Sequence, residues 1–369
     1  MNEIQILEKL VSYPTITPQE CGIYEFIKEI LPDFKIKEFH KNGVKNLFLY
    51  KEFENSQSNH HLCFAGHIDV VPAGEGWESD PFIPQIKGEY LYGRGTQDMK
   101  GGVAAFLSAV CEFKENKNVK ILSILLTSDE EGEAIYGTKY VLEELQKEKL
   151  LPHFAVVAEP TSLKEFGDMI KIGRRGSING VLRILGKQGH VAYPSKCINP
   201  LDFLAKVLHK ISGFNLDEGK DGFEPSKIVI TDIRGGMEVV NVTPSEVKIM
   251  FNIRNSPSTT LEDVKTYFDT LLKDIPHKLE LKQSSKPFLT NKESKIALKL
   301  QEVLKQVNGF TPILSTSGGT SDARYFAEFG VEVVECGVVN DKIHSVNECV
   351  KISEVNALKD CFKTLLEKF

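Results

Sequence analysis

The feature that most constrains the fold is a continuous apolar run over residues 121–126, Ile-Leu-Ser-Ile-Leu-Leu. A strand with apolar side chains on both faces needs helices on both sides of its sheet. Helices are predicted over 101–114 and about 134–147, and further strands over 62–65 and 154–158. Strands and helices that alternate in this way predict an α/β domain whose sheet is largely parallel.

The pattern changes after about residue 175. Strands are predicted over 176–186, 227–235 and 246–253, with one helix opening at Asn199-Pro200 and another at a capping box over 259–262. Helix and strand alternate again from Lys292, with a helix to Asn308, a strand over 331–335 and a final helix from Ser353. The sequence therefore predicts a discontinuous α/β domain, residues 1–175 and 288–369, with a smaller α+β domain, 176–287, inserted into it.

Two further segments carry predictions near the N-terminus. Ile4, Leu7, Leu10 and Val11 recur at helical spacing and predict a short helix that ends near Pro14. A second helix is predicted after Thr17, with Pro18 in its first turn. Residues 72–95 are rich in Gly, Pro and Asp and are predicted to form a long loop beside a site.

Composition excludes several classes of protein. The net charge is −6 and no Lys/Arg block is present, which argues against nucleic-acid binding. The seven cysteines are scattered without a Cys-x-x-Cys pair, so we expect reduced thiols and a cytoplasmic protein. We expect no signal peptide and no membrane segment, because no apolar run approaches about 20 residues.

Acidic and imidazole side chains follow the predicted strands of the α/β domain, where open sheets place their sites. Each of them taken alone has an ordinary alternative as a polar turn or a helix-end carboxylate. Together, two histidines and several carboxylates at one sheet edge suit a pair of hydrolytic zinc ions, with one carboxylate bridging them. The residues concerned are His67, Asp69, Asp98, Glu130, Glu131, Glu159 and His344.

Four motifs make the chain resemble a known family. They are Gly-His-x-Asp-Val-Val-Pro from residue 66, Trp-x-x-Asp-Pro-Phe from 77, Tyr-Gly-Arg-Gly-x-x-Asp-Met-Lys-Gly from 92 and Asp-Glu-Glu-Gly from 129. In combination they resemble the di-zinc amidohydrolase and exopeptidase family of aminoacylases, acetylornithine deacetylases, glutamate carboxypeptidases and succinyl-diaminopimelate desuccinylases. The resemblance implies a zinc-exopeptidase-like mixed sheet flanked by helices, with the inserted domain acting as a lid and as the contact of a homodimer.

The resemblance also implies roles for individual residues. His67 and Glu159 would hold one Zn²⁺, Glu131 and His344 the other, and Asp98 would bridge them; Co²⁺ is expected to substitute. Glu130 would be the general base and Asp69 the partner of His67, and the Asp98-Met99 peptide would be cis. His190 would donate to the oxyanion in the site of a partner subunit, with a polar surface histidine as the equal alternative.

Motifs later in the chain, among them Gly173–Ser177, Gly189–Pro194 and Gly318–Arg324, are most similar to those of the desuccinylases. They imply hydrolysis of N-succinyl-LL-2,6-diaminopimelate to succinate and LL-2,6-diaminopimelate, for lysine and peptidoglycan precursors. The residues that would face the substrate are Arg174, Ser177, Asn241, Arg254 and Thr320, with Arg254 and Thr320 on the succinyl carboxylate.

An acidic protein that binds an anionic substrate needs local positive charge, and the guanidinium group binds a carboxylate through two parallel hydrogen bonds. Arg174-Arg175, Arg254 and Arg324 are the candidates; a solvated turn charge is the alternative for the first pair. Other readings are a related deacylase or dipeptidase, such as an acetylornithine deacetylase, and a non-catalytic metal-binding protein. A nucleotide-binding loop at Gly93-Arg94-Gly95 lacks the full fingerprint.

Overall fold

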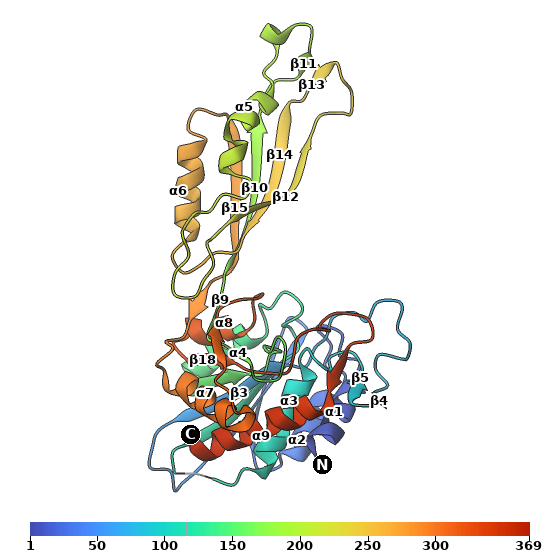
Figure 1. Ribbon diagram of the computed structural model, residues 1–369, viewed down its shortest axis with the longest axis vertical. Helices are drawn as coiled ribbons and strands as arrows, with labels where there is room; N and C mark the ends of the chain where they lie inside the picture. Colours follow the sequence, from blue (N-terminus) through green and yellow to red (C-terminus); the bar gives the residue numbers. More distant parts are fainter. Residues whose placement is uncertain (116) are drawn as a thin grey trace. The chain divides into compact units, whose positions relative to one another are not determined.

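The computed structural model describes residues 1–115 and 117–369, which form two compact units. Unit 1 comprises Met1–Ile172, Thr290–Ser315 and Ser321–Phe369, and unit 2 comprises Gly173–Leu289 and Thr316–Thr320. The boundaries near 173 and 289 lie two or three residues from the predicted ones, whereas the assignment of the short segment 316–320 to unit 2 was not predicted. Figure 1 labels the elements of both units. No helix in the described residues is long and apolar enough to cross a membrane.

The core of unit 1 is an eight-stranded sheet of order β1-β2-β6-β3-β7-β18-β8-β17. Strands β6, β3, β7 and β18 are parallel neighbours, whereas β1, β2 and the β18–β8 contact are antiparallel. The predicted mixed sheet with a parallel centre is therefore confirmed. The strands are β1 (Lys35–Lys41), β2 (Val44–Glu52), β3 (His61–His67), β6 (Ile121–Thr127), β7 (Phe154–Val157), β8 (Met169–Lys171), β17 (Ile313–Ser315) and β18 (Glu332–Glu335).

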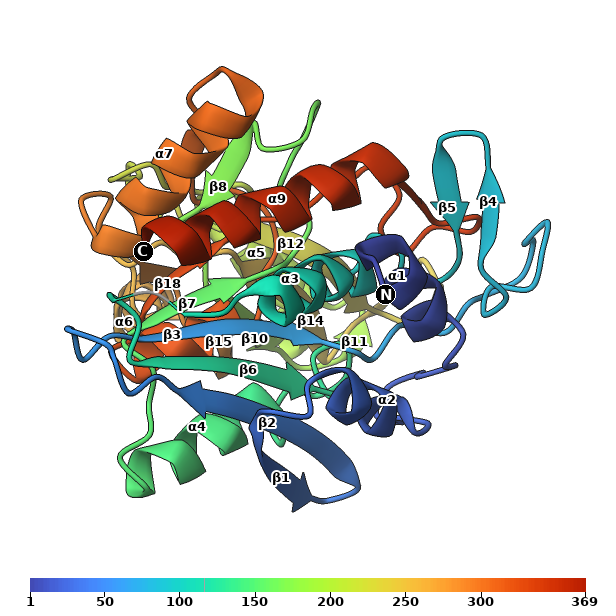
Figure 2. The same cartoon turned by 90° about the horizontal axis from the view of Figure 1, so that it is seen from below.

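The helices of unit 1 bury the sheet. Helix α3 is buried almost all round, as its sequence predicts. It packs directly against α9 (Figure 2). A Cβ atom at Gly102 of α3 would lie 2.2 Å from the carbonyl oxygen of Ala158, so glycine permits the close approach of this helix to the end of β7. The helices are α1 (Glu3–Val11), α2 (Ile23–Ile30), α3 (Lys100–Glu112), α4 (Thr138–Lys147), α7 (Lys295–Asn308), α8 (Ala323–Glu328) and α9 (Ile352–Lys368).

Three local predictions for unit 1 are wrong. Helix α2 does not start at Pro18: the Thr17-Pro18 peptide is cis, and the helix begins after Gly22, whose φ is 85°. The predicted loop 72–95 contains β4 (Gln85–Lys87) and β5 (Tyr90–Tyr92), which join β19 (Cys349–Lys351) in a small sheet. The helix predicted from about residue 134 begins at Thr138: residues 134–137 are not helical, and Ala134 takes a left-handed φ of 54°.

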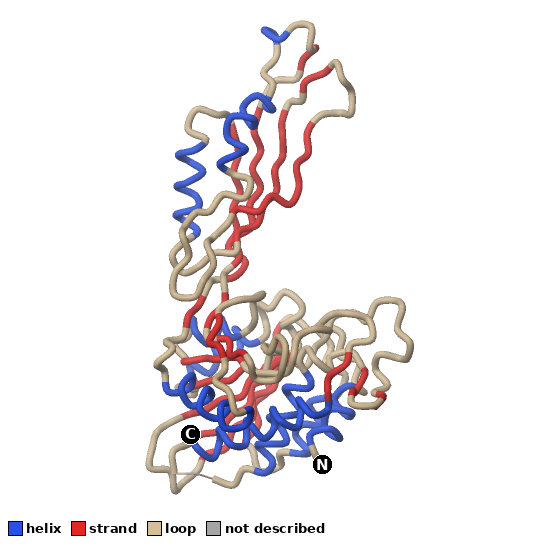
Figure 3. Tube along the Cα trace, viewed as in Figure 1, coloured by secondary structure: helices blue, strands red, loops and turns tan. Residues whose placement is uncertain are grey.

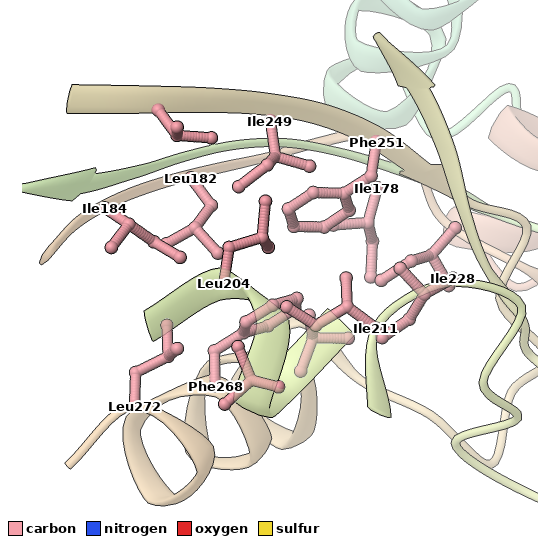
Figure 4. Close-up of a cluster of buried hydrophobic side chains, with 14 residues drawn as sticks. Ile178, Leu182, Ile184, Leu204, Ile211, Ile228, Ile249, Phe251, Phe268 and Leu272 are labelled. Atoms are coloured by element: carbon pink, nitrogen blue, oxygen red, sulfur yellow. The ribbon is translucent and has the colours of Figure 1, made fainter. Parts of the chain in front are cut away.

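Unit 2 is built on an antiparallel sheet of order β12-β14-β10-β15 (Figure 3). The inward side chains of the sheet and the apolar faces of α5 and α6 share one hydrophobic core, which includes Ile178, Ile249, Phe251 and Phe268 (Figure 4). The elements are β9 (Gly173–Arg174), β10 (Ser177–Leu185), β11 (Gly189–His190), α5 (Pro200–Val207), β12 (Ile228–Gly235), β13 (Val242–Thr243), β14 (Glu246–Ile253), α6 (Leu261–Leu271), β15 (His277–Ser285) and β16 (Phe288–Leu289).

The N-caps of the two helices in unit 2 can be compared with those predicted from the sequence. Asn199 caps α5 ahead of Pro200, as predicted. The capping box of α6 is formed one residue later than predicted, by Thr260 and Asp263, because the side chain of Thr259 donates to Asp217 instead. The alternation of partly buried and exposed side chains makes β15 a strand with one solvated face, a pattern that the sequence analysis missed.

Candidate metal centre

Three neighbouring parallel strands deliver most of the predicted ligands. His67 is the last residue of β3 and pairs in register with Thr127, the last residue of β6. Glu130 and Glu131 follow β6 closely, and Glu159 follows β7. Because β6, β3 and β7 are parallel, their carboxyl ends meet at one edge of the sheet, which is where the chain was predicted to hold its site.

Asp98 stands between the two histidines and presents one oxygen to each. Its Oδ1 lies 3.1 Å from His67 Nε2, and its Oδ2 lies 3.2 Å from His344 Nε2. Glu159 lies 3.9 Å from His67 Nε2, and Glu131 lies 2.8 Å from His344 Nε2. Among the described residues, three overlapping sets of donor atoms lie within 4.8 Å of one another: His67/Asp98/Glu159, Asp98/Glu131/His344 and His67/Glu130/Glu131. Asp98 is common to the first two sets, which each combine one histidine with two carboxylates.

The ring of His67 is oriented by Asp69, although not through its carboxylate. Nδ1 of His67 donates to the backbone carbonyl of Asp69 at 2.8 Å, whereas the nearer carboxylate oxygen is 3.7 Å away. The Asp69 carboxylate instead accepts the backbone N–H groups of Glu130 and Glu131 at 3.3 and 3.1 Å. Asp69 therefore turns Nε2 of His67 toward the site and also holds the backbone of the turn that carries the two glutamates.

Glu348 holds the segment that leads to Asp98, a function the sequence analysis missed. Its buried carboxylate accepts Nη1 of Arg94 at 2.8 Å and the backbone N–H groups of Gly95, Gln97 and Asp98 at 2.8 to 3.2 Å. The Asp98-Met99 peptide that follows is cis, as the resemblance implied. The only available signal was a glutamate near a ligand histidine, since its partners lie about 250 residues earlier in the chain.

The backbone at Glu159 is closely packed against two other segments of the chain. A Cβ atom at Gly337, just after β18, would lie 2.2 Å from the carbonyl oxygen of Glu159. Gly102 of α3 makes the corresponding close approach to the carbonyl of Ala158. Backbone contacts therefore enclose the peptide that carries this ligand on two sides.

The electrostatics of the cluster fit divalent cations. Burial raises the pKa of Glu130 well above its usual range, and the neighbouring Glu159, Asp322 and Glu131 carboxylates add to this. Burial opposes protonation of His67, but the hydrogen bond to Asp98 and the charges of Asp69 and Glu159 raise its pKa well above the usual value. Crowded carboxylates facing imidazole Nε2 atoms are a nitrogen–oxygen donor set that two divalent ions would neutralise.

We expect zinc binding by the metal-free protein to strengthen as the pH rises from about 6 to about 8. Hydrogen bonds to Asp98 and Glu131 raise the pKa of His344 to about 10, so its imidazole is protonated at neutral pH and must lose that proton to bind a cation. The raised pKa of His67 acts in the same direction. Calorimetric titrations in buffers of different ionisation enthalpy would count the protons released. An affinity that does not change over this range would contradict the protonation states inferred here.

The residues predicted to face the substrate lie in unit 2, together with His190. Arg174 and Ser177 are buried: Nη1 of Arg174 donates to the carbonyl of Ser317 at 3.3 Å, and Oγ of Ser177 accepts from Asn252 at 2.9 Å. The Oγ1 of Thr320 lies 3.2 Å from Oγ of Ser285. His190, Asn241 and Arg254 are exposed. Among the other candidates, Arg175 pairs with Glu224 at 2.7 Å, and Arg324 is buried in unit 1 against the ring of Tyr325.

Solved structures of other proteins share the fold. An aminopeptidase PepT from Bacillus cereus superimposes with a TM-score of 0.81 at 20% identity, covering 100% of this chain and 98% of that one. The YXEP protein of Bacillus subtilis, described as a dinuclear metal binding peptidase from the M20 family, gives a TM-score of 0.71 at 12% identity, covering 99% and 96% of the two chains. At these identities the likeness shows the fold alone.

Closer relatives are similar over their whole length. The succinyl-diaminopimelate desuccinylase of Wolinella succinogenes is 57% identical over 364 residues, covering 99% of this chain and 98% of the relative. The protein of the same description from Helicobacter hepaticus is 55% identical over 381 residues, covering 99% and 97%. The model of peptidase family M20/M25/M40 matches residues 63–368. With the match extending from the strand that ends in His67 to the final helix, the chain is an enzyme that belongs to peptidase family M20/M25/M40.

Proposed function

We propose that the enzyme hydrolyses N-succinyl-LL-2,6-diaminopimelate to succinate and LL-2,6-diaminopimelate, a step toward lysine and peptidoglycan precursors. The observation that carries the proposal is the pair of donor sets sharing Asp98, with Glu130 beside them, in a chain that is more than half identical to desuccinylases over its full length.

The donor sets support two Zn²⁺ per subunit, one held by His67 and Glu159 and the other by Glu131 and His344, with Asp98 between them; we expect Co²⁺ to replace zinc. Bound there, the ions supply Lewis acidity toward an amide carbonyl and a water molecule. Neither histidine needs to move to act as a ligand, because both Nε2 atoms already face Asp98.

Glu130 serves as the general base in this proposal. It groups with His67 and Glu131 within 4.8 Å, and its raised pKa suits a carboxylate that takes a proton from water near neutral pH. The same carboxyl then delivers the proton to the leaving amine. Its backbone is held by Asp69, which fixes the position of the side chain.

His190 donates to the oxyanion in this proposal, from the unit 2 of a partner subunit. Its Nδ1 accepts the backbone N–H of Ala192 at 3.1 Å, so the ring proton of the neutral form resides on Nε2, which is therefore a donor. Unit 2 also has exposed apolar side chains. Val191 and Tyr193 follow His190 in the chain, and Met237, Val239 and Val240 lie on a later segment of the same unit, with Val240 99% exposed. We propose that they contribute to a homodimer formed through unit 2; sedimentation equilibrium would measure its mass.

Positive charge in unit 2 supports an anionic substrate. Arg254 lines a cavity of about 400 Å³ together with Arg175 and Lys227. The lining includes one carboxylate, Glu224, which already pairs with Arg175. This excess of cations suits a carboxylate ligand of Arg254. Thr320 is not among the residues that line this cavity and contacts Ser285. We propose that Arg254 and Thr320 hold the succinyl carboxylate, while Arg174, Ser177 and Asn241 contact the rest of the substrate.

A substrate comparison tests the proposed function. Zinc-loaded protein is assayed on N-succinyl-LL-2,6-diaminopimelate and on N-acetylornithine, with chelated protein as the control. Metal-dependent turnover of the succinyl compound alone is the expected result, because a site built for a terminal carboxylate leaves its cations unpaired when an acetyl group binds. Turnover of the acetyl compound alone would reassign the site to a related deacylase, and turnover of neither would favour a dipeptidase.

Replacing Arg254 by alanine is expected to raise KM for the succinyl substrate by roughly 10- to 100-fold, since a hydrogen bond to a charged group contributes about 1.5–3 kcal/mol. Steady-state kinetics would measure the change. Arg234→Ala is the matched control, because Arg234 is exposed on β12 and pairs with Asp232 outside the cavity. An unchanged KM in the Arg254 variant would remove this residue from the substrate site.

A further inference from the structure

The loop that carries His344 is the least protected part of the metal centre. Asp341, Lys342, Ile343 and His344 are all exposed, and the His344 side chain is 49% exposed against 2% for His67. The backbone of His344 also takes a left-handed φ of 58°, which is unfavourable for a residue other than glycine. Such a conformation persists only where the surroundings hold it, so the contacts of this loop decide where His344 points.

Gln97 makes those contacts. Its Nε2 donates to Oδ1 of Asp341 at 2.7 Å, and its Oε1 accepts the backbone N–H of Lys342 at 2.8 Å. Across residues 1–115 and 117–369, these are the hydrogen bonds that join Asp341 and Lys342 to a distant part of the chain; the contact of Ser345 with Lys342 is local. Gln97 thus holds the two residues that precede Ile343 and His344. Further contacts of the loop are that of the His344 ring with Glu131 and those at its two ends, where Asn340 bonds to Ser162 and Asn347 to Glu78.

Gln97 is itself rigidly placed. It is 3% exposed, and its backbone N–H donates to Glu348 at 2.8 Å, next to the bond that Glu348 accepts from Asp98. It immediately precedes Asp98, the residue common to both donor sets. A fixed residue adjacent to one ligand therefore holds the loop that supplies another.

The chemistry of this contact requires an amide. The side chain at position 97 must donate to a carboxylate and accept from a backbone N–H at the same time, and among the neutral side chains of this length only glutamine does both. A carboxylate there would accept from Lys342 but face the Asp341 carboxylate without a proton to donate.

We infer that Gln97 is a positioning residue for one of the two metal sites. It fixes His344 relative to Asp98 and so supports the Asp98/Glu131/His344 site, while the His67/Asp98/Glu159 site, whose other ligands come from the ends of β3 and β7, does not depend on it. The inference rests on the proposed dinuclear centre.

The test is a calorimetric titration of metal-free full-length protein with Zn²⁺, resolving the two equivalents. Gln97→Ala is expected to weaken one equivalent roughly 10- to 100-fold and to leave the other within about twofold, as for losses of residues that orient ligands. Visible absorption of Co²⁺-loaded protein should change for one of the two ions. Thr96→Val is the matched control: Thr96 is buried in the same segment, but its hydroxyl donates to Gly93 and not to the loop.

A reciprocal exchange separates positioning from general damage. Gln97→Glu alone should weaken the same equivalent as Gln97→Ala, because two carboxylates then face each other. The double variant Gln97→Glu/Asp341→Asn exchanges the carboxylate and the amide, restores both hydrogen bonds, and should recover most of that affinity. Equal weakening of both equivalents, no weakening of either, or no recovery in the double variant would overturn the inference. Wild-type protein that binds fewer than two ions would instead contradict the dinuclear centre itself.

Discussion

Replacing Glu130 by glutamine is expected to lower kcat by about 100- to 10,000-fold, the usual contribution of a general acid–base residue. Glutamine keeps the shape of the side chain and its position above the Asp69-bound backbone, but its amide cannot take a proton from water. Burial first, and then the neighbouring carboxylates, raise the pKa of Glu130, which suits a group that takes a proton near neutral pH.

Steady-state kinetics with zinc content measured on the same preparation would test the prediction. Glu133→Gln is the matched control, because Glu133 is an exposed glutamate in the same turn. Retained turnover in the Glu130 variant would end its assignment as the base. Loss of one zinc ion would make Glu130 a ligand, a role that its grouping with His67 and Glu131 would permit.

The second large effect is expected at Asp98. Replacement by alanine should weaken both zinc equivalents by at least about 100-fold, more than the loss of a residue that only orients a ligand, because both donor sets share this carboxylate. Glu159→Ala and His344→Ala should each weaken one equivalent, since each belongs to a single set.

Titration of the three metal-free variants with Zn²⁺ would distinguish these outcomes, with near-ultraviolet circular dichroism to verify the fold. If Asp98→Ala lost one equivalent and kept the other, Asp98 would be a ligand of one ion and no bridge. If His344→Ala lost both, the two sites would fill cooperatively and the separate assignments would have to be revised.

The central architecture could be predicted because strands that are buried on both faces have continuous apolar sequences. The apolar runs of β3, β6 and β7 are buried on both faces and could be recognised without a partner. The positions of His67, Glu130, Glu131 and Glu159 followed from the same signal, since a histidine or carboxylate just beyond a buried strand lies at a predictable edge of the sheet. Their role as metal ligands stays a prediction.

The elements that were not predicted have less distinctive sequence patterns. Strand β1 is largely exposed on both faces and β15 is solvated on one, so neither shows a continuous apolar run. The start of α2 depends on a left-handed Gly22 and not on the Thr17-Pro18 pattern that imitates a helix start. The start of α2 thus depends on local backbone geometry, which composition and periodicity do not report.

Contacts between distant segments could not be predicted at all. Glu348 and Gln97 look like ordinary polar loop residues in the sequence, and their partners lie roughly 250 positions away. Hydrogen bonds of this kind are decided by tertiary structure, so a pattern search finds the ligands of such a site before it finds the residues that hold them.

The glycines beside Glu159 limit how this site can change. Gly102 and Gly337 allow α3 and the segment after β18 to approach the chain closely on either side of the peptide that carries Glu159, since a Cβ atom at either glycine would lie 2.2 Å from a carbonyl oxygen. Where side chains pack against each other, substitutions can change the distance between two segments. At these two contacts the closely approaching residue is a glycine, which has no side chain to shorten. A side chain introduced at either glycine would therefore have to displace α3 or the segment that follows β18. The position of the peptide that carries Glu159 is in this way set by how the backbone segments pack, so changes to this end of the donor cluster would have to come from the Glu159 and His67 side chains themselves.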